Sequence, residues 1–365
     1  MPNKDHIPAL DGLRGIACLL ILAGHFLTQN RQALPPALLT AFSQYWSGVD
    51  LFFVLSGFVI FLSLNQLRER TRGFPGLLVP FATSRAFRIL PVYILFLLAY
   101  FCLPLIEPQL SRDELFLSSV PKCLYLFFGQ SWYMALRQRG GAEFVDASWS
   151  LCAEVFLYAL AFVIVCFAPN RNRIKAMVAA AAVSFACRLF VVFFTDNFLA
   201  AYLLPVCRMD GFMLGGVVAE LYARGGLASV NFQRLNRTLA VLFCVFAALS
   251  IGARHFASGF SILFSYAFYS VFYSAILVRL TGGGFPILSR GPLSYIGTIS
   301  YFVYLFHFPI VYWMRNVAED RHWNVALNFA MTVGVTVAAA TLSWYAMEKP
   351  IIGLGKALNR RLASR

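Results

Sequence analysis

The sequence predicts an all-α, polytopic membrane protein with about ten transmembrane helices. Of its 365 residues, 60% are hydrophobic and only 13% are charged, whereas about a quarter of a soluble domain is charged. The mean hydropathy is +0.71. Apolar blocks of about 20 residues, the length of a spanning helix, recur from end to end. These observations exclude a disordered chain and leave no room for a separate soluble domain.

Ten apolar blocks are predicted to span the membrane. The longest polar stretches, residues 68–84 and 137–147, are predicted to be loops. We expect one domain over residues 1–365, with a core over 7–350 and a cytoplasmic tail over 351–365. The predicted spans are residues 9–28, 46–65, 87–106, 148–168, 175–194, 198–222, 238–255, 260–280, 295–314 and 326–347.

An eleventh block, 116–134, contains Pro121, Lys122 and Gly129. If the N-terminus is cytoplasmic and this block does not cross, 19 basic residues lie in cytoplasmic segments and 8 in outer ones. If the block crosses, the basic stretch 171–175 and the C-terminus lie outside. Because basic residues concentrate on the cytoplasmic side, we predict a re-entrant or interfacial segment and place both termini in the cytoplasm.

The net charge of +14 arises from 30 Lys and Arg against 16 Asp and Glu. In a soluble protein this excess would suggest a nucleic-acid partner. In a membrane protein it fits basic cytoplasmic loops, so we expect the lipid bilayer and no nucleic acid as a partner. The eight cysteines include no CxxC pair, and the sequence therefore predicts no metal site.

Ionisable residues inside apolar spans are costly and mark functional or structural contacts. Arg14 and His25 lie eleven residues apart in the first span, so they share one helix face about 16 Å apart. Arg14 would lie near the cytoplasmic end and His25 in the outer half of the bilayer. The alternatives are an Arg14 side chain that reaches the interface and a purely structural hydrogen bond of His25.

The fourth span carries Ser150, Glu154 and Tyr158 on one face, at i, i+4 and i+8. Glu154 would lie about 9 Å below the outer end of this helix, near the depth of His25. A carboxylate beside an imidazole orients it and raises its basicity. Glu154 and His25 are therefore candidate partners, and a structural ion pair or a protonated Glu154 is the alternative.

Three further charges lie in or near the membrane. Arg208 and Asp210 occupy the block 198–222, and residues at i and i+2 do not face each other, so each needs its own partner. Asp50 opens the second span, where it would pair with a cation or meet interfacial water.

The ninth span carries Tyr304 and His307 on the same face as Ser300, at i, i+4 and i+7. Before the third span, Arg85 and Arg88 lie three residues apart at the predicted start of a helix. Two guanidinium groups on one side of a helix N-terminus suit a phosphate ligand. The alternative for this pair is the cytoplasmic charge bias alone.

Taken together, these motifs resemble those of the acyltransferase 3 family of integral membrane O-acyltransferases, which modify O-antigen and exopolysaccharide. The resemblance covers about residues 7–350. It rests on five motifs in the family's order, none of which is specific alone. They are Arg14 with His25, the Gly48–Phe58 segment, Arg85 with Arg88 before Pro91 and Tyr93, Ser150 with Glu154, and Tyr304-Leu305 with His307 and Pro309.

The resemblance implies ten transmembrane helices in the bacterial cytoplasmic (inner) membrane. It implies transfer of an acyl group, most often acetyl, from cytosolic acyl-coenzyme A to a hydroxyl. The acceptor would be a cell-surface glycan, such as lipopolysaccharide or exopolysaccharide, or its lipid-linked precursor. Some relatives carry an extracytoplasmic hydrolase-like domain. We expect that any handover to such a partner uses a separate protein.

The resemblance also implies residue roles. His25 would be the base, held by Glu154, and Arg85 and Arg88 would bind the coenzyme's phosphates with help from Arg14. Asp50, Ser150, Arg208, Asp210, Tyr304 and His307 are candidates for substrate or oxyanion contacts, or for structural roles. The motif around Glu154 carries a single acid where the family often has two, which argues against a two-carboxylate mechanism.

Two other functions fit the same residues. In a proton-coupled transporter or flippase, His25, Glu154, Asp210 and His307 would form a proton relay. No inverted repeat supports that reading. In a second alternative the enzyme acylates a small secondary metabolite such as a macrolide, and only the acceptor separates this function from glycan acylation.

Overall fold

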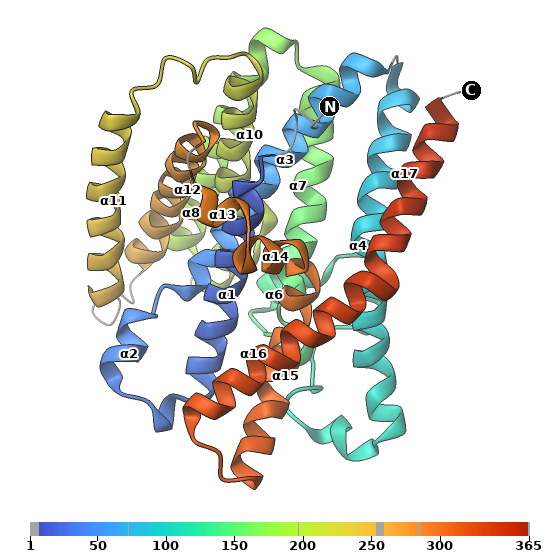
Figure 1. The fold of residues 1–365 in the computed structure, drawn as a ribbon, viewed down its shortest axis with the longest axis vertical. Coiled ribbons are helices and arrows are strands. Elements are labelled where there is room, and N and C mark those ends of the chain that lie inside the picture. The colour runs from blue at the N-terminus through green and yellow to red at the C-terminus, as the bar shows by residue number, and fades with distance from the viewer. Residues whose placement is uncertain (1–6, 72, 196, 253–258, 284, 364–365) are drawn as a thin grey trace. The chain divides into compact units, whose positions relative to one another are not determined.

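The computed structural model describes residues 7–71, 73–195, 197–252, 259–283 and 285–363. Within these ranges all regular elements are helices (Figure 1), which confirms the all-α prediction. Eight helical runs in this part of the chain are long and apolar enough to cross a membrane. A bent pair, α14 (Pro292–Thr298) and α15 (Ser300–Asp320), makes a ninth if it forms one span.

Eight of the ten predicted spans correspond to these helices to within a few residues, except where a helix runs on beyond its apolar block. The last residues of the predicted block 238–255 lie outside the described residues. The eight helices are α1 (Ala9–Gln29), α3 (Gly48–Arg70), α4 (Gly73–Ile106), α7 (Ser148–Phe167), α8 (Arg173–Phe194), α11 (Phe232–Gly252), α12 (Gly259–Thr281) and α16 (Val325–Ser343).

The predicted span 198–222 is broken, so the prediction of one continuous helix there is wrong. It consists of α9 (Phe198–Leu203), a 3₁₀ turn over Pro205–Arg208 and α10 (Met209–Ala223). Leu204 is extended, with ψ of 125°, because the residue before a proline is pushed out of the helical region. The 15 residues of α10 are fewer than the roughly 20 of a full span.

The predicted span 295–314 also departs from one straight helix, since α14 and α15 meet at a bend of 85°. Ile299 lies at this bend, with φ of −93° and ψ of 7°. The break turns the backbone just before Ser300, the first residue of α15.

Residues 68–70 and 73–84 are helical, which corrects the prediction of a loop over 68–84. Helix α3 continues to Arg70, and α4 begins at Gly73, whose φ of +73° lets the chain reverse. Arg68 and Arg70 fall in the last turn of α3, where cations favour the helix C-terminus. Polar helix ends can therefore extend beyond an apolar block without becoming loops.

The predicted tail 351–365 forms a helix, α17 (Lys349–Ala363). A π-helical turn, Trp344–Glu348, joins α16 directly to α17. Proline at residue 350 sits in the first turn of α17, where its missing N–H is tolerated. Helix continues from Val325 through Ala363, and α17 packs on α4.

The ambiguous block 116–134 forms two short helices, α5 (Lys122–Leu126) and α6 (Gln130–Arg137), and neither is long enough to span a bilayer. The Tyr93 hydroxyl of α4 donates to the backbone oxygen of Tyr125 at 2.7 Å. Gln130 Nε2 donates to the backbone oxygen of Ser148 at 2.9 Å. These bonds fasten the segment to α4 and to the start of α7. Its position in the membrane stays a prediction.

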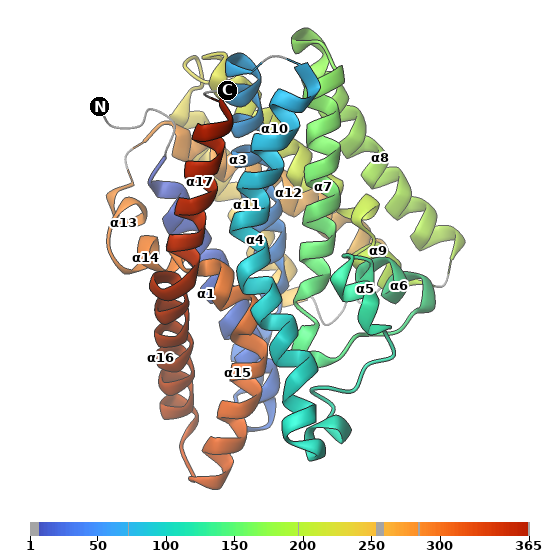
Figure 2. The ribbon, with the colours of Figure 1, turned by 90° about the vertical axis from the view of Figure 1, so that its right-hand side faces the viewer.

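The chain divides into two compact units. The first unit holds residues 1–62 and 153–298, and the second holds 63–152 and 299–365. In the first, α1 packs on α14, and α10 packs on α8 and α12. In the second, α15 runs beside α16, and α17 beside α4 (Figures 1 and 2). A single domain over residues 1–365 stays a prediction.

Candidate active site

The carboxylate of Glu154 is held by two hydroxyl groups in the first unit. Ser56 Oγ of α3 and the Tyr158 hydroxyl, one turn further along α7, each donate to Glu154 Oε1 at 2.5 Å. The shared face of Glu154 and Tyr158 is the one that their spacing predicted. Ser56 was not among the residues predicted for the site. Because both donors meet one oxygen, the carboxylate is fixed in one orientation.

A close helix crossing sets the position of Ser56. A Cβ atom on Gly57 of α3 would lie 1.9 Å from the Phe212 carbonyl oxygen, and one on Gly215 of α10 would lie 2.0 Å from the Val54 carbonyl oxygen. Only glycine allows such an approach of two backbones. The crossing therefore fixes the depth and rotation of α3 where it presents Ser56 to Glu154.

His25 lies half-buried on α1, in the same unit as Glu154. Its ring packs edge-on against Tyr45, with centroids 5.1 Å apart. Gly24 permits this packing, since a Cβ there would lie 1.9 Å from Tyr45 Cγ. The Tyr45 ring thus positions the imidazole. The predicted pairing of His25 with Glu154 stays a prediction.

Arg14 lies nearly three turns before His25 on α1. Its Nη1 lies 3.3 Å from Asp11 Oδ1, one turn earlier, and both side chains are about one-fifth exposed. The Arg14 guanidinium is thus partly buried and still reachable from solvent. It can serve a phosphorylated ligand, as predicted for a coenzyme contact, or hold Asp11, whose negative charge in the first turn stabilises the start of α1.

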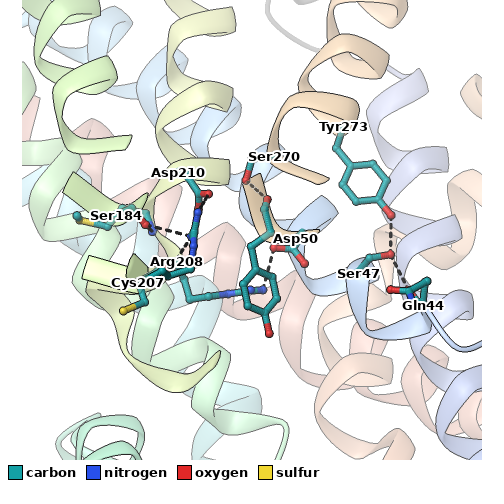
Figure 3. Close-up of polar contacts among 12 residues, drawn as sticks. Gln44, Ser47, Asp50, Ser184, Cys207, Arg208, Asp210, Ser270 and Tyr273 are labelled. Carbon is teal, nitrogen blue, oxygen red and sulfur yellow. Dashed lines mark hydrogen bonds and ion pairs between the residues drawn. The ribbon is translucent and has the colours of Figure 1, made fainter. Parts of the chain in front are cut away.

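Two of the buried ion pairs in the first unit join an arginine to an aspartate (Figure 3). Arg208 Nη2 donates to Asp50 Oδ1 at 2.8 Å, and Arg188 Nη2 donates to Asp210 Oδ2 at 2.5 Å. The prediction that Arg208 and Asp210 need separate partners is confirmed, as is the cation partner considered for Asp50. Arg188 of α8 was missed, although a lone arginine inside an apolar block is itself a signal.

The two pairs are embedded in further contacts. Arg188 Nη1 also donates to the Cys207 carbonyl oxygen, and the Arg208 guanidinium lies 3.8 Å from the Tyr266 ring centroid. Each guanidinium is at most 1% exposed. A buried charge that has lost its partner costs several kcal/mol, so these four side chains bind α3, α8, α10 and the turn before α10 to one another.

The second unit brings together Ser150, Tyr304 and His307. Ser150 Oγ lies 2.6 Å from the Tyr304 hydroxyl oxygen, and both hydroxyls also reach the Ala147 carbonyl oxygen. Each of these three residues therefore belongs to one polar group, built from the start of α7 and the middle of α15. Their predicted roles toward substrate stay predictions.

The hydrogen bond of His307 fixes its tautomer. Nδ1 lies 2.7 Å from the Tyr304 carbonyl oxygen, which can only accept, so Nδ1 carries the hydrogen. In a neutral ring the lone pair then sits on Nε2. His307 is 1% exposed, and in its neutral form the ring thus presents Nε2 as a hydrogen-bond acceptor inside the unit.

Arg85 and Arg88 lie in the interior of α4, more than three turns beyond its start at Gly73. The prediction that they open a helix is wrong, because the polar stretch before them is helical, and no N-terminal dipole supports an anion there. Arg85 is half-buried over the Phe81 ring, and Arg88 is exposed. Arg88 interacts electrostatically with Glu348. The two remain three residues apart, so both leave α4 on neighbouring faces.

Among the residues that the structure describes, no group of three or more His, Cys, Asp or Glu side chains could hold a metal ion.

A comparison with protein families matches residues 7–348 to the acyltransferase domain family. The chain is 26% identical over 369 residues to the O-acetyltransferase OatA of Staphylococcus aureus strain NCTC 8325, covering 96% of this chain and 58% of that protein. It is 25% identical to a putative O-acetyltransferase of S. aureus strain COL, covering 98% of this chain and 59% of the relative.

The chain thus spans just under three fifths of the length of these curated relatives. No solved structure shows significant similarity to it. The family match covers nearly the whole chain, over helices long and apolar enough to lie in a membrane. The chain belongs to the acyltransferase 3 family, and its long apolar helices are those of an integral membrane protein.

Proposed function

We propose that the protein transfers an acetyl group from acetyl-coenzyme A to a hydroxyl of a cell-surface glycan or of its lipid-linked precursor. The observation that carries this proposal is Glu154. Its carboxylate is fixed by Ser56 and Tyr158 within an apolar unit that also contains His25. The relatives named as O-acetyltransferases support the acetyl group and the hydroxyl acceptor.

The chemistry needs a base for the acceptor's proton. His25 accepts the hydroxyl proton while the hydroxyl oxygen attacks the thioester carbonyl carbon. The tetrahedral intermediate then collapses, the carbon–sulfur bond breaks, and the proton passes from His25 to the leaving thiolate. Glu154 stabilises the imidazolium that forms between these two steps. The products are an acetyl ester and free coenzyme A.

The donor would bind on the cytoplasmic side. Arg85 and Arg88 present guanidinium groups on adjacent faces of α4, and Arg88 is exposed. Guanidinium groups bind phosphate oxygens in a bidentate manner, which suits the diphosphate and 3′-phosphate of the coenzyme. Arg14 is a further candidate for the coenzyme or its pantetheine arm.

The acceptor side involves the polar residues of α7 and α15. The hydroxyls of Ser150 and Tyr304, hydrogen-bonded to each other, are suited to bind a sugar hydroxyl or to donate to the oxyanion. The protein would lie in the bacterial inner membrane with both termini cytoplasmic. A partner that carries the acylated group further would be a separate protein or a further part of a longer chain.

The test is an acetyl-transfer assay with purified protein in proteoliposomes, using acetyl-coenzyme A labelled in the acetyl group and lipid-linked glycan. His25→Ala and Glu154→Gln should each lose at least 99% of the transfer rate, since a positioned base contributes about 10²–10⁴-fold. Full activity of the His25→Ala variant would refute the mechanism.

Two matched controls separate chemistry from folding. His322 is exposed and has φ of +54°, so His322→Asn removes an imidazole without straining the backbone, because asparagine tolerates this conformation. The Glu319 side chain is 71% exposed, and Glu319→Gln removes a carboxylate at the surface. Both controls should retain full transfer activity. A wild-type protein that moves solute or lipid without cleaving acetyl-coenzyme A would instead favour transport.

A further inference from the structure

Helix α17 lies beyond residue 348, where the match to the acyltransferase domain ends. It nevertheless packs along α4 in the second unit, and the two helices run side by side (Figures 1 and 2). The segment of α4 that it covers is the one that carries Arg85 and Arg88.

Two contacts fix the register of α17 on α4. Gly355 faces the Phe87 ring, since a Cβ there would lie 2.8 Å from Phe87 Cγ. Asn359 Nδ2 donates to the Pro80 carbonyl oxygen at 3.0 Å and to Ser84 Oγ at 2.9 Å. Later residues of α17 thus meet earlier residues of α4. The two helices are antiparallel in this register, and Lys356 lies at the level of Arg85 to Arg88.

The same contacts show which face of α4 and which face of α17 meet. Successive residues turn by about 100° around a helix, so Arg88 lies about 100° beyond Phe87, and Lys356 about 100° beyond Gly355. Because the two right-handed helices run in opposite directions, these two turns lead to the same side of the pair. Arg88 and Lys356 therefore lie on the same side of the α4–α17 helix pair.

Arg360 and Arg85 extend this set. Arg360 follows Lys356 by one turn, and its Nε donates back to the Lys356 carbonyl oxygen at 3.5 Å. Arg85 precedes Arg88 by almost one turn on α4. Arg88, Lys356 and Arg360 are exposed, and Arg85 is half-buried. We call Arg85, Arg88, Lys356 and Arg360 the basic edge.

Glu348 is the acidic side chain that interacts with Arg88. It is 3% exposed, and Ser343 Oγ donates to its Oε1 at 2.9 Å. Its carboxylate is thus turned into the π-helical turn and balances part of the charge of one arginine. The basic edge therefore gathers four cationic side chains, one of which interacts with Glu348.

We propose that the basic edge binds the phosphorylated nucleotide end of the acyl donor, so that α17 supplies Lys356 and Arg360 to the donor site. This inference rests on the proposed function. The nucleotide end of coenzyme A carries a diphosphate and a ribose phosphate, about four negative charges near neutral pH. Two arginines leave about half of that charge without a counterpart, and four cations match it.

The experiment measures binding of acetyl-coenzyme A and of adenosine 3′,5′-bisphosphate by calorimetry, with the protein in phosphatidylcholine nanodiscs. The variant Lys356→Ala/Arg360→Ala should weaken both affinities roughly ten- to hundredfold, as expected for two lost charge-assisted contacts. The variant Lys356→Arg keeps the charge and should bind like wild type. Both variants should turn over an acetyl thioester that lacks the nucleotide at the wild-type rate, because that substrate does not reach the basic edge.

Arg361→Ala is the matched control, because Arg361 is exposed on the same helix and points about 100° away from Arg360. It should bind acetyl-coenzyme A like wild type. Equal thermal melting temperatures of all variants show that α17 still packs on α4. Binding by Lys356→Ala/Arg360→Ala that equals wild type, while Arg85→Ala/Arg88→Ala loses it, would overturn this inference and leave the proposed function standing.

Phospholipid headgroups also carry phosphate, so a second part of the experiment distinguishes lipid binding from donor binding. The same titrations are repeated in nanodiscs that contain phosphatidylglycerol. Loss of acetyl-coenzyme A affinity in the double variant with both lipids supports a donor site. Unchanged donor affinity, together with a lost preference for phosphatidylglycerol, would assign the basic edge to lipid instead. Failure of the wild type to bind acetyl-coenzyme A at all would overturn the proposed function itself.

Discussion

Arginine occurs in two contrasting settings in this protein. In the first unit, Arg188 and Arg208 are almost completely buried and each forms an ion pair with an aspartate. In the second unit, Arg88 and Arg360 are exposed along the α4–α17 pair. A buried cation must carry its counterion with it, whereas an exposed one can exchange water for a ligand. The same side chain therefore holds helices together in one unit and is suited to bind a substrate in the other.

The largest expected effect comes from breaking a buried pair. Arg208→Ala leaves Asp50 buried without its cation and should reduce the free energy of unfolding by about 3–5 kcal/mol, seen as a lower thermal melting temperature. Arg88→Ala on the exposed side should leave the melting temperature unchanged. Similar losses from both variants would remove the contrast between the two settings.

The double variant Asp50→Leu/Arg208→Met sharpens this prediction. Replacing both partners of a buried pair by apolar side chains is often neutral for stability, so the melting temperature should recover. If the recovered protein transfers acetyl groups, the pair is structural. If it is stable and inactive, the pair contributes to substrate binding or catalysis as well.

The second effect concerns the crossing of α3 and α10. Gly215→Ala places a Cβ 2.0 Å from the Val54 carbonyl oxygen, so the helices must separate, at a cost of about 1–3 kcal/mol. The loss should appear in thermal melting and in a lower transfer rate, because Ser56 moves with α3. Gly334→Ala on α16 is the control, since that glycine faces open space. A tolerated Gly215→Ala would contradict the close crossing.

The third effect concerns the hydroxyls that hold Glu154. Ser56→Ala and Tyr158→Phe should each lower kcat about tenfold or more, since a hydrogen bond to a charged group contributes about 1.5–3 kcal/mol. KM for acetyl-coenzyme A should stay unchanged. Ser56→Thr keeps the hydroxyl and should retain most of the activity. A change in KM alone would place these residues in substrate binding rather than in positioning the carboxylate.

The smallest effect is expected at the acid beside the basic edge. Glu348→Gln keeps the hydrogen bond from Ser343 but removes the negative charge next to Arg88. Acetyl-coenzyme A should then bind about threefold more tightly, the size of a partly exposed ion-pair interaction. Glu319→Gln, at the surface of α15, should change nothing. Weaker binding by Glu348→Gln would mean that the carboxylate positions Arg88 for the phosphate.

Apolar length and composition predicted most of the fold. Eight predicted spans are helices because an apolar stretch of about 20 residues has few other ways to satisfy its backbone. The errors fall where local chemistry competes with this rule. Pro205 breaks one predicted span and Ile299 bends another, while the polar stretch before Arg85 stays helical because polar residues also form helix ends.

For the candidate site, spacing predicted which residues share a helix face but not which helix they meet. The shared face of Glu154 and Tyr158 follows from a separation of four residues. Ser56 lies 98 residues away from Glu154, and nothing in the local pattern connects them. Arg188 could have been noticed as a charge in an apolar block, yet its choice of Asp210 depends on how α8 and α10 pack.

The sequence by itself determined the family, the membrane setting and the residue types available for acyl transfer, because hydrophobic length and motif order are local properties of the chain. Only the tertiary structure decided which charges are neutralised and which stay exposed, that two hydroxyls hold Glu154, and that the helix after the family domain returns to the arginine pair of α4. These outcomes depend on contacts between helices far apart in the chain, whose register and rotation are set by close packing rather than by local preference.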